Sequence, residues 1–223
     1  IHGGCGYTEE FPAARTVRDS RINRIFEGTN EINRLFIPGV LMRRAQRGRF
    51  PLVAAITKVT KELFDPAPLE DGSGGDELAV AQALLVNAKK LALFVSGVAY
   101  QKFGEKLVEE QEVVGRLSEI IMDVYLGESA LLRTLKTRKS APNAFGAVLS
   151  DLTLNFINDA AGRMELHARH ALAAASQGDE LRAQLGIVRR LLRWTPLNGV
   201  ALQRRIAKRL CDVGSYPALV AAK

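Results

Sequence analysis

The stretch Phe26-Glu27-Gly28-Thr29-Asn30-Glu31-Ile32 decides how the first part of the chain folds. Glycine adopts positive φ without a steric penalty, so a turn or a close approach of the backbone to a ligand is expected at Gly28. Thr29 or Asn30 can then cap a helix that we expect to cover residues 30–46. The first N–H groups of such a helix have no partner within it and point back towards the turn.

A single carboxylate, that of Glu27, stands just before this turn. The side chains near it in the sequence are apolar, and removal of water from a carboxylate raises its pKa towards a value that suits a general base. The same residues are also typical of an ordinary helix start, at which an acidic side chain is favoured by the helix dipole. The local sequence leaves both interpretations open. The apolar neighbours are Ile22, Ile25, Phe26, Ile32, Leu35 and Phe36.

The composition is that of a globular protein rich in helix. Of the 223 residues, 47% are hydrophobic and 25% are charged, whereas only 6% are aromatic, and this mixture favours helix over strand. Cys5 and Cys211 lie far apart and match no metal-binding spacing, which is typical of a reducing compartment. No signal peptide is visible, and apolar runs such as residues 91–95 are far shorter than the ~20 residues of a membrane span. Because the chain starts in a glycine-rich turn without Met, we expect it to be part of a longer protein.

Helical periodicity continues to the end of the chain and predicts an all-α fold. We expect residues 1–48 to form part of one helical domain, residues 49–75 a helix and a linker rich in Pro, Gly and acidic residues, and residues 76–223 an additional bundle of antiparallel helices. Pro38 is expected to bend the helix over residues 30–46. The other expected helices cover residues 12–20, 52–64, 76–103, 106–138, 144–176, 179–194 and 198–213.

Several charged groups invite a functional interpretation that their spacing does not require. His167 and His170 lie three residues apart near Glu165, but no second pair of ligands accompanies them, so exposed or hydrogen-bonded histidines are expected and no metal site is predicted. The net charge of +7 is spread over every helix without interleaved aromatics, which argues against nucleic-acid binding. The basic clusters at residues 189–193 and 204–209 are typical of solvated faces, or of a surface that meets anionic lipid headgroups.

Taken together, about the first 45 residues resemble the acyl-CoA dehydrogenases, a family of FAD-dependent enzymes of fatty-acid β-oxidation. The likeness rests on the order and spacing of four motifs: GGCGY at residues 3–7, FP at 11–12, RD at 18–19 and FEGTNEI at 26–32. The rest of the chain is similar, more weakly, to the extra helical domain of the long- and very-long-chain members. That likeness is carried by Glu109-Glu110-Gln111, Arg116-Leu117-Ser118-Glu119 and Asp123-Val124-Tyr125.

The resemblance implies a role for individual residues. Glu27 corresponds to the catalytic base that removes the α-proton of the acyl-CoA thioester, and its backbone N–H to one donor of an oxyanion hole that a ribityl hydroxyl of FAD completes. Gly28 corresponds to a substrate contact. The residues that correspond to FAD contacts are Ile1, His2, Gly3, Gly4, Thr29, Asn30, Glu31 and Gln111, the first four through a loop usually contributed by a neighbouring subunit.

The implied reaction converts long-chain acyl-CoA to trans-2-enoyl-CoA, with FAD as the hydride acceptor. The expected partners are the acyl-CoA substrate, an electron-transfer flavoprotein and a second copy of the chain, in a cytoplasmic or peripherally membrane-associated enzyme. The family's N-terminal helical domain and central β domain are not in this sequence, so the fragment alone is expected to be inactive. Two alternatives stay open: a helical dimerisation or membrane-surface module, and a flavin oxidase of the same fold.

Overall fold

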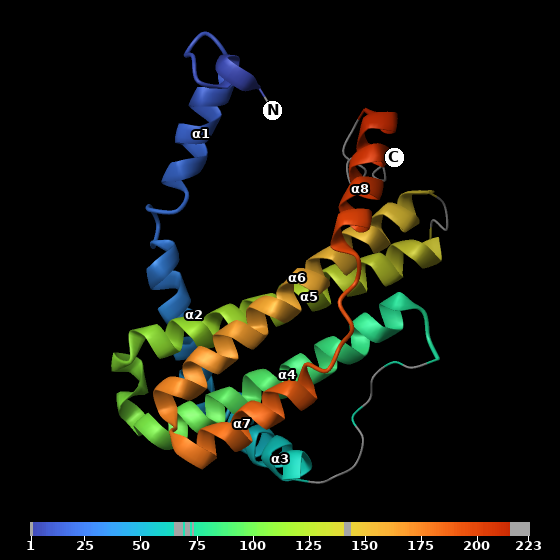
Figure 1. The fold of residues 1–223 in the computed structure, drawn as a ribbon. Helices are drawn as coiled ribbons and strands as arrows, with labels where there is room; N and C mark the ends of the chain where they lie inside the picture. Colours follow the sequence, from blue (N-terminus) through green and yellow to red (C-terminus); the bar gives the residue numbers. More distant parts are fainter. Residues whose placement is uncertain (1, 65–68, 70–71, 73, 141–143, 215–223) are drawn as a thin grey trace.

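The computed structural model describes residues 2–64, 69, 72, 74–140 and 144–214, and these residues form helices and no strand. Three long helices pack against one another at the centre of a bundle (Figure 1): α4 (Glu77–Phe103), α5 (Gln111–Ser140) and α6 (Ala144–Ala175). Two shorter helices lie on this centre, α7 (Gly178–Leu191) against α6 and α4, and α8 (Gly199–Val213) against α6. The all-α fold that the sequence predicts is confirmed.

The N-terminal helices join the bundle at one side (Figure 1). Helix α3 (Leu52–Phe64) packs on α4, and α2 (Asn30–Gln46) packs on α5, whereas α1 (Pro12–Ile22) and the 3-10 turn η1 (Gly3–Gly6) project away from the bundle. No residue of α1 is buried. The loop between α1 and α2, which carries Glu27, therefore lies where the chain leaves the bundle.

One apolar core holds the helices together. Leu91, Ile120 and Leu172, one from each central helix, are completely shielded from water, and burial of each such side chain contributes roughly 1.5–3 kcal/mol. Helix α3 joins the same core through Val59 and Leu63, so the packing of the bundle continues into the segment before residue 75. The domain boundaries expected from the sequence stay a prediction, and most of the expected linker lies outside the described residues.

Helix α4 is unusually apolar. Within the described part of the chain, the helical stretch Glu77–Glu109 is long and apolar enough to cross a membrane. Yet 56% of its most apolar window is buried inside the bundle, as expected of the central helix of a packed core. The purely apolar runs of this helix stay short, as the sequence indicates, and it is the whole helix that has the length and mean hydropathy of a span. Polar residues such as Asn87 and Lys89 interrupt the apolar runs, but the mean hydropathy of the helix stays high.

Polar contacts tie the central helices at the end where α4 begins. Asp76 caps α4 by accepting from Ala79 N–H at 3.1 Å, and it also accepts from Arg138 Nη1 of α5 at 2.9 Å. The hydrogen bond from Arg138 is the main cause that lowers the pKa of Asp76. Between α5 and α6, the hydroxyl oxygens of the buried residues Thr134 and Thr153 lie 2.8 Å apart. Helices α4, α5 and α6 are thus joined by polar bonds as well as by apolar packing.

Two helix boundaries differ by three or more residues from those that the sequence predicts. A helix was expected from residue 106, but Gly104–Glu109 forms a 3-10 turn, η2, and α5 begins at Gln111. The reason is Gly104, whose φ of +58° ends α4 and redirects the chain. Helix α7 ends at Leu191, before the expected residue 194. Pro196 has no N–H and favours an extended conformation of the residue before it, which explains the early end.

Candidate functional site

The loop between α1 and α2 is closed by its own backbone. The N–H groups of Ile25 and Phe26 donate to the carbonyl of Ile22 at 2.9 and 3.1 Å, which continues the end of α1 as a tight turn. Further along, Asn30 N–H donates to the carbonyl of Arg24 at 3.1 Å. These bonds bring the two ends of the loop together and leave a short segment between them at its tip.

Glu27 and Gly28 form this tip with left-handed backbone. Glu27, at φ +55°, is the one residue other than glycine with positive φ in the described part of the chain, and Gly28 follows at φ +94°. Any side chain at position 28 would be strained, and its Cβ would lie 3.1 Å from Oδ1 of Asn33. Asn33 in turn donates from Nδ2 to the carbonyl of Gly28 at 2.9 Å. The turn predicted at Gly28 is confirmed, and the hydrogen bond from Asn33 joins it to the first turn of α2.

Thr29 is the N-cap of α2, since its Oγ1 accepts from Ile32 N–H at 3.1 Å. The N–H groups of Glu27, Gly28 and Thr29 themselves have no hydrogen-bond acceptor among the described residues. Three consecutive donors and a carboxylate thus share one short segment, at the positive end of the α2 dipole. Such a segment can accept a proton and can donate hydrogen bonds to an oxygen atom that gains negative charge.

The Glu27 carboxylate is exposed to solvent, so the expected removal of water from it is wrong for this chain. The apolar side chains that flank the loop are exposed as well, with 46% of Ile22, 50% of Phe26 and 59% of Phe36 accessible. The reason is that α1 and the start of α2 project from the bundle, so no described element covers the loop (Figure 1). The carboxylate would lose water only when another molecule or chain segment covers this apolar surface.

The other candidate residues lie away from the loop. His2 directly precedes the turn η1, which is at the opposite end of α1, a helix of 11 residues and therefore about 16 Å long. Gln111 is the exposed first residue of α5, on the bundle. Ile1 lies outside the described residues. The structure does not bring these residues to the loop. Those that it groups there are Glu27, Gly28, Thr29, Asn30 and Glu31.

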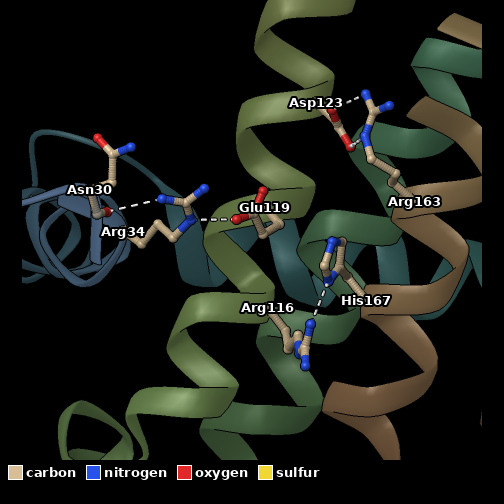
Figure 2. Close-up of polar contacts among 7 residues, drawn as sticks. All are labelled: Asn30, Arg34, Arg116, Glu119, Asp123, Arg163 and His167. Atoms are coloured by element: carbon tan, nitrogen blue, oxygen red, sulfur yellow. Dashed lines mark hydrogen bonds and ion pairs between the residues drawn. The ribbon is translucent and has the colours of Figure 1, made fainter. Parts of the chain in front are cut away.

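A row of charged side chains that the sequence reasoning missed lies along α5 (Figure 2). Arg34 of α2 donates to the carbonyl of Asn30 at 3.1 Å and forms an ion pair with Glu119 of α5. One turn further along α5, Asp123 accepts two hydrogen bonds from Arg163 of α6, at 3.1 and 2.7 Å. The sequence signal for this row is the helical spacing of charged residues on a face of α5 that is otherwise apolar.

Arg116 of α5 and His167 of α6 complete the row, with 3.2 Å between Arg116 Nη1 and His167 Nδ1 (Figure 2). Because arginine can only donate, the ring accepts at Nδ1 and carries its proton on Nε2. Burial, followed by the charge of Arg116, holds the pKa of His167 below its ordinary value of 6.5. His167 is thus a hydrogen-bonded histidine, as the sequence indicates. Within the residues that the structure describes, no group of three or more His, Cys, Asp or Glu side chains could hold a metal ion.

The basic clusters near the C-terminus take part in contacts between helices. Arg205 of α8 forms a two-point ion pair with Asp151 of α6, at 3.0 and 2.7 Å. Arg190 of α7 donates to the carbonyl of Leu63 in α3 at 3.0 Å. These two cations therefore stabilise the packing of α8 and α7 on their neighbours.

The fold and the loop together define a class: an all-α protein in which a candidate base stands in a left-handed turn before a helix that packs on a bundle. Two family models described as acyl-CoA dehydrogenase, C-terminal domain, match the chain, one over residues 1–42 and the other over residues 87–190. The two matches together take in more than half of the sequence. The chain belongs to the acyl-CoA dehydrogenase family.

Individual relatives agree with this assignment. A probable acyl-CoA dehydrogenase of Bacillus subtilis (strain 168) is 40% identical over 218 residues, which are 97% of this chain and 36% of that protein. The crystal structure of an acyl-CoA dehydrogenase complexed with FAD from Bacillus anthracis matches with a TM-score of 0.91 at 42% identity, over 95% of this chain and 36% of that one. The human mitochondrial short-chain specific acyl-CoA dehydrogenase is 58% identical over 43 residues, 19% of this chain and 10% of that enzyme. This chain thus spans about a third of the length of its two extended matches.

Proposed function

We propose that the chain is the C-terminal part of an FAD-dependent acyl-CoA dehydrogenase that converts long-chain acyl-CoA to trans-2-enoyl-CoA in fatty-acid β-oxidation. The observation that carries the proposal is the tip of the loop, where the Glu27 carboxylate lies beside three N–H groups without acceptors in the described chain. Family membership and similarity to a structure solved with FAD support it. Since the chain spans about a third of its relatives, we expect no turnover by this chain alone.

In this proposal, Glu27 removes the α-proton of the acyl thioester. Its removal leaves negative charge on the thioester oxygen, to which the free N–H of Glu27 can donate a hydrogen bond. Gly28 has no side chain and so leaves room for the substrate beside the base. Bound FAD would accept the β-hydrogen as hydride. The exposed apolar side chains of Phe26 and Ile32 exclude water once the loop is covered, which favours proton transfer to the carboxylate.

The residues that we propose to hold FAD have polar groups available for it. The side-chain amide of Asn30 and the carboxylate of Glu31 form no bond with any described residue, and the Thr29 hydroxyl accepts one bond while its own proton stays available. A homo-oligomer in which two copies share FAD would supply the remaining proposed contacts, which are exposed and distant from the loop. These are His2, Gly3, Gly4 and Gln111.

The long-chain assignment rests on the bundle. The Bacillus subtilis relative matches 97% of the chain, bundle included, whereas the human short-chain specific enzyme matches only 43 residues. This contrast supports a class of enzyme with an additional helical domain. We expect such an enzyme to act in the cytoplasm and to pass its electrons to an electron-transfer flavoprotein. Rapid reaction of its reduced flavin with oxygen would instead identify an oxidase of the same fold.

The test is the Glu27→Gln variant of the full-length protein that carries this chain, loaded with FAD. Flavin absorbance reports both the amount of FAD bound and its bleaching by acyl-CoA. Loss of the base should slow bleaching by about 10²–10⁴-fold, whereas the amount of bound FAD should not change. Glu105→Gln, which alters an exposed carboxylate of η2, is the control and should bleach normally. Bleaching of Glu27→Gln at the unmodified rate would show that Glu27 is not the base.

A further inference from the structure

Arg34 joins the first turn of α2 to the bundle (Figure 2). Its Nη1 donates to the carbonyl of Asn30 at 3.1 Å, and its guanidinium forms an ion pair with Glu119 of α5. Both charged side chains are partly buried, with 36% of Arg34 and 28% of Glu119 exposed. An arginine that binds two acceptors through its planar fork fixes one acceptor relative to the other. One of these acceptors, Asn30, is the first residue of α2 and lies three positions after Glu27.

The other hydrogen bonds of the loop are local, since each joins two residues between Ser20 and Asn33. They give the loop its shape but do not set its place relative to α5. Among the described residues from Ile22 to Phe36, Arg34 alone forms a hydrogen bond or an ion pair with the bundle. The position of the loop therefore depends on this pair and on the apolar packing of α2.

Apolar packing holds α2 less firmly near the loop than farther along the helix. Leu35 and Met42 pack against the core and Pro38 is buried, but the α2 residues before Arg34 are exposed or only half-buried. Pro38 also has no N–H, so it leaves the carbonyl of Arg34 without its usual helical donor. Arg34 thus acts at the part of α2 that other contacts restrain least.

The acceptor on the bundle is itself firmly held. Glu119 stands between Ser118 and Ile120, both of which are fully buried in α5. One turn further along, the buried carboxylate of Asp123 receives two hydrogen bonds from Arg163 of α6. Helix α5 is therefore a rigid support for the Arg34 side chain.

We propose that Arg34 is a positioning residue for Glu27: through Glu119 it fixes the carboxylate loop to the C-terminal bundle, which thereby contributes to the reaction. The kinetic part of this inference rests on the proposed function, whereas its structural part does not. Without the pair, the first turn of α2 and the loop shift together, and the carboxylate is no longer aligned with the α-proton. A misplacement of about 1 Å can lower a rate by roughly 10²-fold.

The experiment compares Arg34→Gln, Arg34→Lys and Glu119→Gln in the FAD-loaded full-length protein. It measures kcat and KM for acyl-CoA, flavin bleaching in a single turnover, and hydrogen exchange of the amides between Ile22 and Asn33. Arg34→Gln should slow bleaching by about 10²-fold, lower kcat more than it changes KM, and accelerate exchange in the loop. Arg34→Lys should recover part of the rate, because an ammonium group lacks the planar fork that holds both acceptors.

The double variant Arg34→Gln/Glu119→Gln tests whether the two residues act as one unit. It should bleach no more slowly than the slower single variant, since their effects are then not additive. Arg205→Gln is the matched control, because it removes an Arg–carboxylate pair between α8 and α6 instead. This control should leave both bleaching and loop exchange unchanged. Equal acceleration of loop exchange in Arg205→Gln would indicate a general loss of stability and would overturn the positioning role.

Unchanged bleaching and unchanged loop exchange in both Arg34→Gln and Glu119→Gln would also overturn the proposal. If Arg34→Gln does not fold, the Glu119→Gln variant tests the proposal in its place. It is the milder change, because glutamine keeps the length of the side chain and one acceptor oxygen. If the unmodified protein is not bleached by acyl-CoA, the proposed function fails. In that case loop exchange still decides whether Arg34 fixes the loop to the bundle.

Discussion

The backbone at Glu27 is itself an argument for a functional role. Left-handed backbone costs a residue other than glycine roughly 1–2 kcal/mol, and Glu27 adopts it in a loop that no described element covers. The Thr29 cap and the bond from Asn33 to the carbonyl of Gly28 hold this conformation. Strained residues of this kind cluster at functional sites. The outlier therefore points to Glu27 independently of the motif in which it occurs.

His167 makes the stability of the bundle depend on pH. Burial, then the charge of Arg116, lowers the pKa of His167 below 6.5, so the unfolded chain binds a proton there more readily than the folded chain. The contribution of His167 to stability is therefore complete above pH 6.5 and is lost as the pH falls through the lower pKa of the folded state. We expect the thermal unfolding temperature to drop between about pH 7 and pH 5, and to drop less in His167→Gln.

The neighbours of the His167 ring define the control for this measurement. Arg116 and His170 lower the pKa of the ring, whereas the carboxylates of Glu119 and Asp123 act in the opposite direction. His170→Gln changes an exposed ring on the same helix, and it should leave the drop in unfolding temperature in place. A drop of equal size in His167→Gln and in the unmodified protein would contradict the prediction.

At the scale of single residues, local sequence predicted which residues form the loop but not what surrounds them. Glu27, Gly28 and Thr29 are contiguous, so the turn and the helix cap follow from residue types alone. The exposure of Glu27 depends on what packs over the loop, and no local pattern carries that information. Arg34 and Glu119 are 85 positions apart. Helical spacing can place both on half-buried faces, but only the packing of α2 on α5 makes them meet.

Helices α3 and α4 approach closely at one glycine. A Cβ at Gly97 would lie 2.7 Å from Cγ2 of Ile56, so a larger side chain forces one helix or the other to shift. In Gly97→Ala, overpacking of about 1–3 kcal/mol should outweigh a gain in helix propensity of at most about 1 kcal/mol. We expect a lower free energy of unfolding for this variant, measured by urea denaturation.

Gly162 of α6 provides the matched control. It is exposed inside a helix, and a Cβ there would have nothing within 4 Å. Gly162→Ala should therefore raise the free energy of unfolding by about 0.5–1 kcal/mol. An equal increase in the free energy of unfolding in Gly97→Ala would contradict the prediction, because it would mean that α3 and α4 accommodate the added Cβ without loss of stability.

At the scale of elements, helix ends were predictable where glycine, proline or a capping residue marks them. The predicted starts at residues 30, 52 and 144 agree with α2, α3 and α6, and the predicted end at residue 103 agrees with α4. The turn η2 was not predicted, because most of its six residues are also compatible with a helix. Sequence spacing also does not say which face of a helix meets which neighbour, since that depends on how all the helices fill the core together.

For the whole molecule, packing becomes weaker from the bundle towards the N-terminus. Helices α4, α5 and α6 share the core, whereas α1 has no buried residue (Figure 1). The free energy needed to open a backbone hydrogen bond follows such packing. We expect amide hydrogen exchange of the chain 1–223 to be at least about 10²-fold slower in the central helices than in α1, measured by mass spectrometry. Equal protection of α1 and α5 would contradict this.

The apolar character of α4 has a consequence for how the protein is made. Helix α4 leaves the ribosome before α5 and α6, which cover it in the finished bundle. Roughly 70 residues separate Phe103 from Ala175, the ends of α4 and α6, so their synthesis takes roughly 4–14 s. Throughout this interval, a segment apolar enough for a membrane lacks the cover that α6 provides. Chaperones and targeting factors that select apolar segments therefore compete with folding for α4, and the order of helices along the chain sets how long that competition lasts.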